Sequence, residues 1–380
     1  MQKLVRTSYN KDDVIILLKD LTGSMTEQSA EEREAAIQSG THYSEMLPEE
    51  KAPSKEYEAL YEKALSEKCT EIADGIAKLA EIILARQCAC SRKDENCKPI
   101  IVSLARAGIP VGILVKRYIK MKYGINCPHY AVSIIRDKGL DENAMWHIYK
   151  EEMYSTGNSA KNIFFVDGWT GKGVIKHQLD EAVANLKKKS PVWDRLSSDL
   201  YVLADPANIT QFCGTHEDYL LPSACLNSTV SGLTSRTILN SLINVEDGDF
   251  HGGVYFDKFE SIDKSNEFID KISAEFSRIT EKDGSLEEIK GVAGMEVVND
   301  LCNLFDIPDY KKVKPGIGET TRVLLRRIPW KVFINKDISI DDPDIQHILV
   351  LCKEKNIPTM RWDLGTYKVC GVIKELSADA

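Results

Sequence analysis

The segment at residues 167–173 has the composition of a loop that binds a sugar phosphate. It consists of Asp167-Gly168-Trp169-Thr170-Gly171-Lys172-Gly173 and lies between an apolar run and a segment with helical periodicity. A glycine-rich turn at the start of a helix presents backbone N–H groups and a partial positive charge to a phosphate. The Thr170 hydroxyl can add a donor, and the Asp167 carboxylate can accept from ribose hydroxyls. A nucleoside-triphosphate P-loop fits less well, because Gly173 stands where that motif has Ser or Thr.

Two further turns carry small or basic residues of the kind that contact phosphates. The first includes Ser103, Arg106, Ala107 and Gly108, and the second is Arg136-Asp137-Lys138-Gly139. In open parallel sheets ligands bind beyond the carboxyl ends of the strands, so these turns are expected to share one site. There Arg106, Arg136 and Lys138, with Mg²⁺, would offset the charge of a leaving pyrophosphate. The alternative for the second turn is an ordinary solvated loop.

The elements that would position these turns alternate between short β-rich runs and helices, which is typical of βαβ units with a parallel sheet. Strands are predicted at residues 100–104, 130–136, 163–167 and 200–204, with helices at 110–122, 141–153 and 173–189. The Ser/Thr/Asn-rich segment after residue 205 is expected to form a hood over the site. Within that hood, Arg236 is the candidate for an anion contact.

The flanking regions differ in composition from this core. Residues 1–95 are predicted to form a mostly helical extension, with apolar residues every three or four positions between 56 and 87. A basic cluster at residues 311–331 opens a separate small α/β domain in an otherwise acidic chain. The predicted division is therefore 1–95, 96–305 and 306–380.

The overall composition, 43% hydrophobic and 28% charged with a net charge of −9, is that of a soluble globular protein. No apolar run is long enough to cross a bilayer and no secretory signal is evident, so a cytoplasmic location with reduced cysteines, and no membrane partner, is expected. The cluster Cys88, Cys90 and Cys97 lacks the spacing of a zinc knuckle and a clear fourth ligand. The net charge argues against nucleic acid along the whole chain, but it allows a local basic patch.

The ordered motifs resemble one bacterial family. They are residues 103–108, 133–137, 166–173, 221–223, 231–233 and 250–252, together with His42-Tyr43-Ser44-Glu45. The set is similar to the phosphoribosyltransferase-like proteins of tellurium-resistance and stress gene clusters, which are also labelled the cysteine protease StiP family. The resemblance implies a phosphoribosyltransferase-like α/β core and a Mg²⁺-dependent transferase of nucleoside-like metabolite synthesis. Its substrate would be phosphoribosyl pyrophosphate or a related ribose phosphate, with Asp167 orienting the ribose and contacting Mg²⁺ indirectly.

The C-terminal region resembles a Pelota/L7Ae-type RNA-binding fold. The resemblance rests on residues 316–322, 328–337, 344–355 and 357–365. It implies that Gly318, Glu319, Arg322 and Arg326 face RNA, which residues 311–331 would bind. The residue types are consistent with a role in RNA binding, because Arg322 and Arg326 lie four residues apart on one face of a predicted helix and can neutralise phosphates. A solvated basic helix is the alternative.

Two other functions stay open at this level. A non-catalytic nucleotide sensor coupled to RNA is favoured by Gly168, which stands where the transferase pattern has a second acid. A cysteine protease would use Cys225 with a base such as His216 or His251. The acceptor substrate, the RNA target and the formation of a homo-oligomer are not determined by the sequence.

Overall fold

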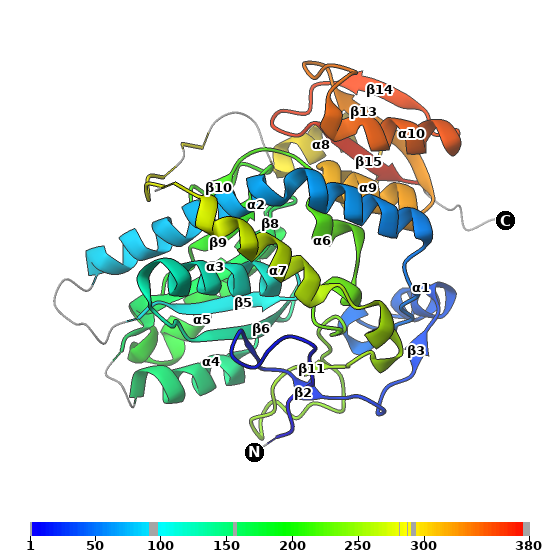
Figure 1. Cartoon of the computed structure of the whole chain (residues 1–380). Helices are drawn as coiled ribbons and strands as arrows, with labels where there is room; N and C mark the ends of the chain where they lie inside the picture. Colours follow the sequence, from blue (N-terminus) through cyan, green and yellow to red (C-terminus); the bar gives the residue numbers. More distant parts are fainter. Residues whose placement is uncertain are drawn as a thin grey trace.

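A mostly parallel sheet forms the centre of the chain in the computed structural model, which describes residues 2–90, 98–154, 158–280, 282–286, 288–289 and 294–374 (Figure 1). The strands, in spatial order, are β1 (Ile15–Ile16), β6 (His129–Ile135), β5 (Ile100–Ala105), β8 (Ile163–Trp169), β9 (Leu200–Ala204) and β10 (Cys213–Thr215), with β7 (Gly139–Leu140) antiparallel to β6. The four predicted strands are confirmed. Their side chains are apolar on both faces because helices cover both sides of a parallel sheet.

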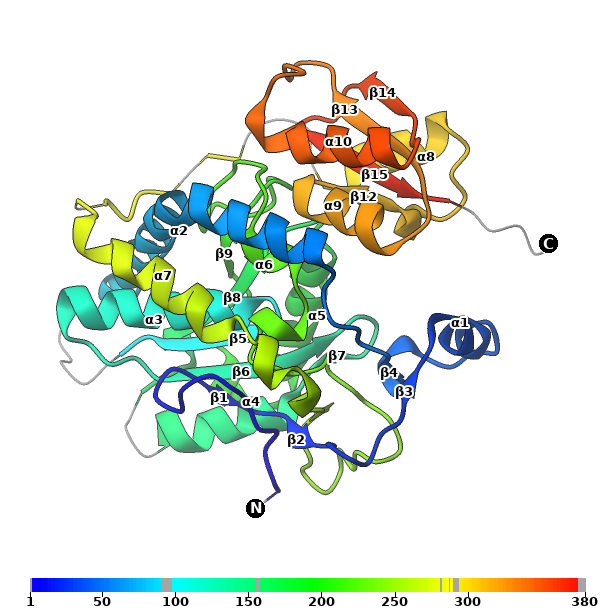
Figure 2. The same cartoon turned by 45° about the vertical axis from the view of Figure 1, so that its right-hand side comes forward.

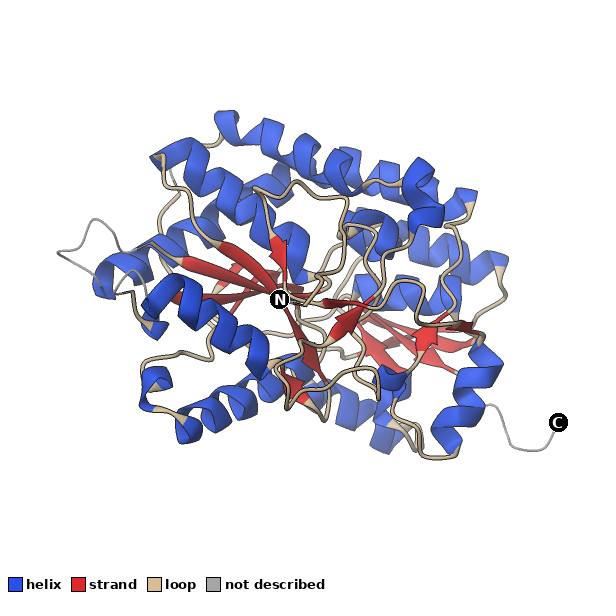
Figure 3. Cartoon of the chain, turned by 90° about the horizontal axis from the view of Figure 1, so that it is seen from below, coloured by secondary structure: helices blue, strands red, loops and turns tan. Residues whose placement is uncertain are grey.

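Helices cover both faces of this sheet, as Figure 3 shows. One face packs against α2 (Lys55–Cys90), α3 (Gly108–Tyr123) and α7 (Ser265–Glu275). The other packs against α4 (Glu142–Ile148), continued by a π-helical turn (Tyr149–Tyr154), and α5 (Val174–Lys189). The predicted helices of the core are therefore confirmed, and the sheet lies buried between two helical layers.

The N-terminal region is only partly helical, which corrects the prediction for it. Besides α1 (Ala30–Gln38) and α2, it contains β1, β2 (Lys19–Asp20), β3 (Glu27–Gln28), a 3₁₀ turn (Tyr43–Glu45) and β4 (Leu47–Pro48). β1 extends the central sheet beside β6, and β2 pairs with β11 (Gly252–Gly253). Strands of two residues carry no recognisable alternation, and the partners of β1 and β2 lie more than one hundred residues away, so the local sequence could not reveal them.

The segment after β9 packs over the carboxyl end of the sheet with little regular structure. It contains β10, α6 (Pro222–Cys225) and 3₁₀ turns at Ser228–Val230 and Asp257–Ile262, followed by α7 and a last 3₁₀ turn (Phe276–Arg278). The role of this segment as a hood over a site stays a prediction. Additional 3₁₀ turns at Ala160–Asn162 and Pro191–Trp193 precede β8 and follow α5.

The small C-terminal α/β domain is confirmed, and it docks on α2 and α6 (Figure 2). Its sheet has the order β12 (Val313–Pro315), β15 (Val369–Ile373), β13 (Pro329–Asn335) and β14 (Thr359–Trp362). It also contains 3₁₀ turns (Tyr310–Lys312, Pro343–Ile345), α9 (Ile317–Arg326) and α10 (Gln346–Glu354). Helix α8 (Met295–Leu304) packs against this sheet and belongs to the same hydrophobic core. None of the described helices combines the length and hydropathy that a bilayer crossing requires.

Candidate active site

The turn that follows β5 touches the end of β8 at the carboxyl edge of the sheet. A Cβ on Gly108 would lie 2.3 Å from the Val166 carbonyl oxygen, and one on Gly168 would lie 3.1 Å from the Ala107 oxygen. Such contacts exclude any larger residue at position 108. Gly173, with φ of +84°, starts α5, and Gly171 faces open space.

The hydroxyls expected at a phosphate are used inside the protein instead. Ser103 is fully buried, donates to the Gly108 carbonyl (3.0 Å) and lies 2.8 Å from His129 Nε2. Thr170 is buried and donates to the Asp205 carboxylate. The Asp167 carboxylate accepts from the Gly168 N–H (2.7 Å), and burial raises the pKa of Asp167 to about 7. These groups therefore bond to other parts of the protein, Ser103 within its own turn and to β6, and Thr170 to the residue that follows β9.

The predicted basic residues do not converge on this loop. Arg106 donates to the Thr234 carbonyl (3.0 Å), Lys172 donates to the Tyr310 carbonyl (2.7 Å), and Lys138 is exposed to solvent. Burial, with nearby Lys314, lowers the pKa of Lys172 to about 8. Arg136 Nε is buried and has no hydrogen-bond partner among the residues that the structure describes. The Mg²⁺ ion expected beside Asp167 stays a prediction.

A cysteine, a histidine and an aspartate lie in line at the adjacent ends of β9 and β10. Asp205 directly follows β9, His216 directly follows β10, and the two strands are parallel neighbours. The Cys213 Sγ lies 3.5 Å from His216 Nε2, and His216 Nδ1 lies 3.2 Å from Asp205 Oδ2. This order of thiol, imidazole and carboxylate is that of a nucleophile, its base and the group that orients the base.

The charges in this set favour a protonated imidazole. The hydrogen bond to Asp205, followed by the contact with Cys213, raises the pKa of His216 from 6.5 to about 10. At neutral pH His216 therefore carries a proton on each ring nitrogen, and the proton on Nε2 points toward Cys213. An adjacent imidazolium stabilises a thiolate, which is the reactive form of cysteine.

The same three side chains could be considered as metal ligands, since one ligand atom from each lies within 4.8 Å of the others. The imidazole, however, stands between the other two groups, with Nε2 toward Cys213 and Nδ1 toward Asp205. One ion cannot contact opposite sides of one ring, so the observed orientation suits a proton relay better than a chelate. Cys97 of the predicted cysteine cluster lies outside the described residues, and the side chains of Cys88 and Cys90 are also not described.

The Asp205 carboxylate also fixes the turn between β9 and β10. It accepts from the N–H groups of Ile209 (2.8 Å) and Thr210 (2.9 Å), in addition to the Thr170 hydroxyl. Cys213 is fully buried, whereas 19% of the His216 side chain is exposed. Cys213 could not be recognised from the sequence because β10 is only three residues long and gives no strand signal. The role of Asp205 depends on the pairing of β10 with β9, which the local sequence does not show.

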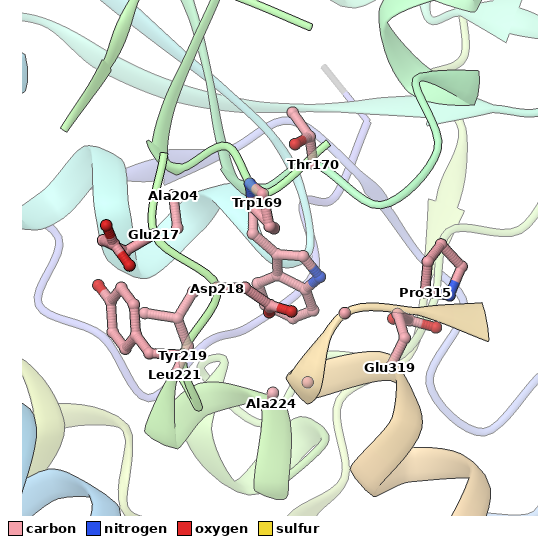
Figure 4. A pocket seen from close by; sticks show the side chains of 13 residues that line it. Trp169, Thr170, Ala204, Glu217, Asp218, Tyr219, Leu221, Ala224, Pro315 and Glu319 are labelled. Atoms are coloured by element: carbon pink, nitrogen blue, oxygen red, sulfur yellow. The ribbon is translucent and has the colours of Figure 1, made fainter. Parts of the chain in front are cut away.

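A small cavity borders this set on the side of the C-terminal domain (Figure 4). Its lining residues include Ala204 and Pro206 on either side of Asp205, Glu217 next to His216, and Thr170. The cavity measures about 20 Å³, which is room for a water molecule and not for a peptide. A substrate can therefore reach the thiol only if the surrounding turns move.

Cys225, the nucleophile expected from the sequence for a cysteine protease, lies in a different environment from Cys213. It is 1% exposed, and burial raises the pKa of its thiol to about 12. The two proposed bases bond elsewhere, because His251 Nδ1 lies 2.8 Å from Ser133 Oγ and His216 faces Cys213. The described contacts therefore favour Cys213 over Cys225 as a nucleophile.

The residues expected to face RNA contact the core of the protein. Arg322 donates to the Ala224 carbonyl (3.0 Å), and its guanidinium lies 4.9 Å from the centre of the Trp169 ring. Arg326 donates to the Cys225 carbonyl (2.7 Å) and to the Asn227 side chain (2.5 Å). Glu319 lies 3.3 Å from Arg322, and Gly318 lines the small cavity. This face of α9 therefore forms part of the junction between the domains.

Comparisons with known proteins match two separate parts of the chain to two different families. Residues 7–273 match the family described as "Tellurite-like stress resistance cysteine protease StiP", and residues 292–375 match the PELOTA RNA-binding domain. A curated relative, "Cysteine protease StiP" of Acinetobacter baylyi, is 29% identical over 386 residues, covering 97% of this chain and 94% of that protein. No solved structure matches the chain.

These matches correct the function predicted from the sequence. The phosphoribosyltransferase activity is wrong, because both the family and the curated relative are named as cysteine proteases. Phosphoribosyl pyrophosphate and magnesium gain no support from these matches. The tellurium and stress association and the Pelota-type domain are confirmed. Since the family match covers more than half of the sequence, the chain belongs to the StiP family, with a Pelota-type domain at its C-terminal end.

Proposed function

We propose that this chain is a cysteine peptidase in which Cys213 is the nucleophile, His216 the general acid and base, and Asp205 the residue that orients His216. The proposal rests on one observation above all. The Cys213 Sγ lies 3.5 Å from His216 Nε2, while His216 Nδ1 lies 3.2 Å from the Asp205 carboxylate. The name of the family and of the Acinetobacter relative supports the same chemistry.

The three residues would perform peptide hydrolysis in two steps. The Cys213 thiolate attacks the carbonyl carbon, and the His216 imidazolium donates its Nε2 proton to the leaving amine as the C–N bond breaks. A water molecule then attacks the thioester, and neutral His216 accepts its proton. The acid is released, and the thiolate and imidazolium are restored. Asp205 keeps the ring in the tautomer and orientation that both proton transfers require.

Access to the thiol requires a change from the described structure. Cys213 is fully buried in the hydrophobic cluster that includes residues of the sheet and of α5. The turn between β9 and β10 is held by the Asp205 hydrogen bonds to Ile209 and Thr210. Opening this turn would free lone pairs on the same carboxylate that orients His216. The proposed peptidase is therefore closed at rest, and a substrate or partner would have to displace elements that pack around Cys213.

The test uses the full chain and a peptidyl acyloxymethyl ketone, which alkylates catalytic thiolates. We expect mass spectrometry to locate the adduct on Cys213, and Cys213→Ala and His216→Gln to abolish both labelling and cleavage of a fluorogenic peptide library. Cys225→Ala is the matched control, because it removes another buried cysteine, and it should retain both. Labelling and cleavage that persist in Cys213→Ala, or a wild-type chain that shows neither, would contradict the proposal.

We also propose that the C-terminal domain binds RNA. The match of residues 292–375 to the Pelota RNA-binding domain supports this, as does the basic cluster at residues 311–331. Binding through phosphates releases counterions, so affinity for RNA should fall steeply as salt rises. Fluorescence anisotropy with a labelled oligonucleotide at 50 and 200 mM salt measures this. Equal affinity at both salt concentrations would count against the proposal.

A further inference from the structure

The largest of the described pockets is a cleft of about 550 Å³ at the junction of the core and the C-terminal domain. Its walls come from the N-terminal segment around residues 29–57, the loops containing Arg106 and residues 225–236, and the end of α9. We call it the interdomain cleft. Its volume lies within the range of roughly 300–1,000 Å³ that is typical of clefts for organic ligands, and it is far larger than a single ion needs.

The interdomain cleft is positively charged, in contrast to the protein as a whole. Six basic residues line it, Arg33, Lys51, Arg106, Arg236, Arg326 and Arg327, against the three acidic residues Glu31, Glu49 and Glu50. The lining therefore carries a net charge of +3, whereas the chain carries −9. A local excess of one charge within a walled site concentrates the field and attracts ligands of the opposite sign.

The acidic residues leave several of these cations uncompensated. Glu50 lies 3.4 Å from Arg106 and also accepts from the Ser228 N–H (2.6 Å), and Glu49 lies 3.5 Å from Lys51. Among the described residues, the guanidinium groups of Arg236 and Arg327 have no hydrogen-bond or ion-pair partner. Both side chains are exposed to solvent, so they are available to a ligand.

Further positive charge extends from the cleft along the junction. Burial lowers the pKa of Lys314, and the charges of Arg136, Arg327 and Arg236 lower it further although Glu319 opposes them. Cations that depress one another's pKa values in this way are stabilised when an anion enters between them.

We propose that the interdomain cleft binds the phosphates of single-stranded RNA, through Arg236 of the StiP-family region and Arg327 at the end of α9. The inference rests on the RNA binding proposed above. It places the contact with RNA in the interdomain cleft instead of on an outer face of α9. Because Arg322 and Arg326 contact the core, RNA that reaches α9 meets the cleft instead of a free outer face. Tyr57, half-buried in the cleft wall with Arg326 at 5.2 Å from its ring centre, offers a surface for one base.

The experiment measures anisotropy of a fluorescent 12-nucleotide oligouridylate with the full chain. We expect Arg236→Ala with Arg327→Ala to weaken binding at least tenfold, and Arg236→Lys alone to recover most of the loss seen with Arg236→Gln. The slope of log affinity against log salt should fall by about 0.7 for each phosphate contact removed. Arg195→Ala is the matched control, since Arg195 is also exposed and does not line the cleft.

The outcomes separate three possibilities. If the wild-type chain does not bind the oligonucleotide, the proposed RNA function fails. If it binds and the double variant binds equally well, RNA binding stands and the cleft is excluded as its site. Competition with adenosine monophosphate and with inorganic phosphate tests whether the cleft prefers RNA or a small phosphate compound. Displacement of the oligonucleotide by either, at a concentration near the dissociation constant of the oligonucleotide, would overturn the assignment to RNA. Equal melting midpoints of the variants would show that they fold normally.

Discussion

Replacing Asp205 by asparagine tests the arrangement of Cys213, His216 and Asp205 most directly. The Asp205 carboxylate is fully buried and accepts hydrogen bonds from Thr170, from the N–H groups of Ile209 and Thr210, and from His216. Asparagine keeps the shape of the side chain. It removes the negative charge and turns one acceptor into a donor, so at least one of these donors loses its partner.

The expected magnitude follows from the pKa of His216. The pKa rises from 6.5 to about 10, mainly through the hydrogen bond to Asp205. A difference of 3.5 units, at 1.36 kcal/mol per unit, stabilises the imidazolium by roughly 5 kcal/mol. Because the pKa of the folded protein is raised, this stability is fully present below pH 6.5 and is lost as the pH rises toward 10. In the Asp205→Asn protein the pKa should fall toward 6.5, and the dependence on pH between 6.5 and 10 should largely disappear.

Two measurements check this prediction. Nuclear magnetic resonance of ¹³C-labelled histidine, with His216 assigned from the His216→Gln spectrum, gives the pKa directly. Urea unfolding at pH 6.5 and pH 10 gives the change in stability. Asp194→Asn is the control, because Asp194 is exposed, and it should leave both quantities unchanged. A wild-type His216 that titrates near 6.5, or a titration that Asp205→Asn does not move, would refute the electrostatic argument and the proposed catalytic set with it.

Three further substitutions test other parts of the structure. Burial raises the pKa of Asp167 to about 7, so the folded protein loses stability as the pH rises from 4 to 7. In urea unfolding, Asp167→Asn should stabilise the protein at pH 8 by up to roughly 4 kcal/mol and have little effect at pH 3.5. A Cβ on Gly214 would lie 2.6 Å from the Gly75 oxygen and 2.8 Å from the Leu203 oxygen. Gly214→Ala should therefore lower the free energy of unfolding by about 3 kcal/mol. The control Gly171→Ala adds its methyl group to open space and should change the melting midpoint little. The Asp218 carboxylate accepts from the N–H groups of Ile317 (2.8 Å) and Lys368 (2.9 Å) and so links the C-terminal domain to the core. Asp218→Ala should therefore accelerate limited proteolysis at the junction relative to the control Glu246→Ala. Equal cleavage rates of the two variants would contradict this.

The sequence alone was sufficient for the regular parts of the fold. The strands at 100–104, 163–167 and 200–204 are apolar runs long enough to show a buried strand, and α2 repeats its apolar residues over many turns. The turns after β5 and β8 were expected at one edge because parallel strands end there, and the turn after β5 does contact the end of β8. The motifs of the family and of the Pelota-type domain are local in sequence, so the residues alone are enough to indicate both.

The function depended on contacts that no local pattern contains. A glycine-rich turn with Asp167 and Thr170 has the composition of a phosphate loop, and only the tertiary structure shows that Thr170 is bound to Asp205. Cys213 and His216 are three residues apart, but their relation to Asp205 depends on β10 lying parallel to β9. The charge of the interdomain cleft likewise arises from residues more than two hundred positions apart. Residue types limit the chemistry that is available, whereas distances between side chains, which packing alone determines, decide which of it the protein can use.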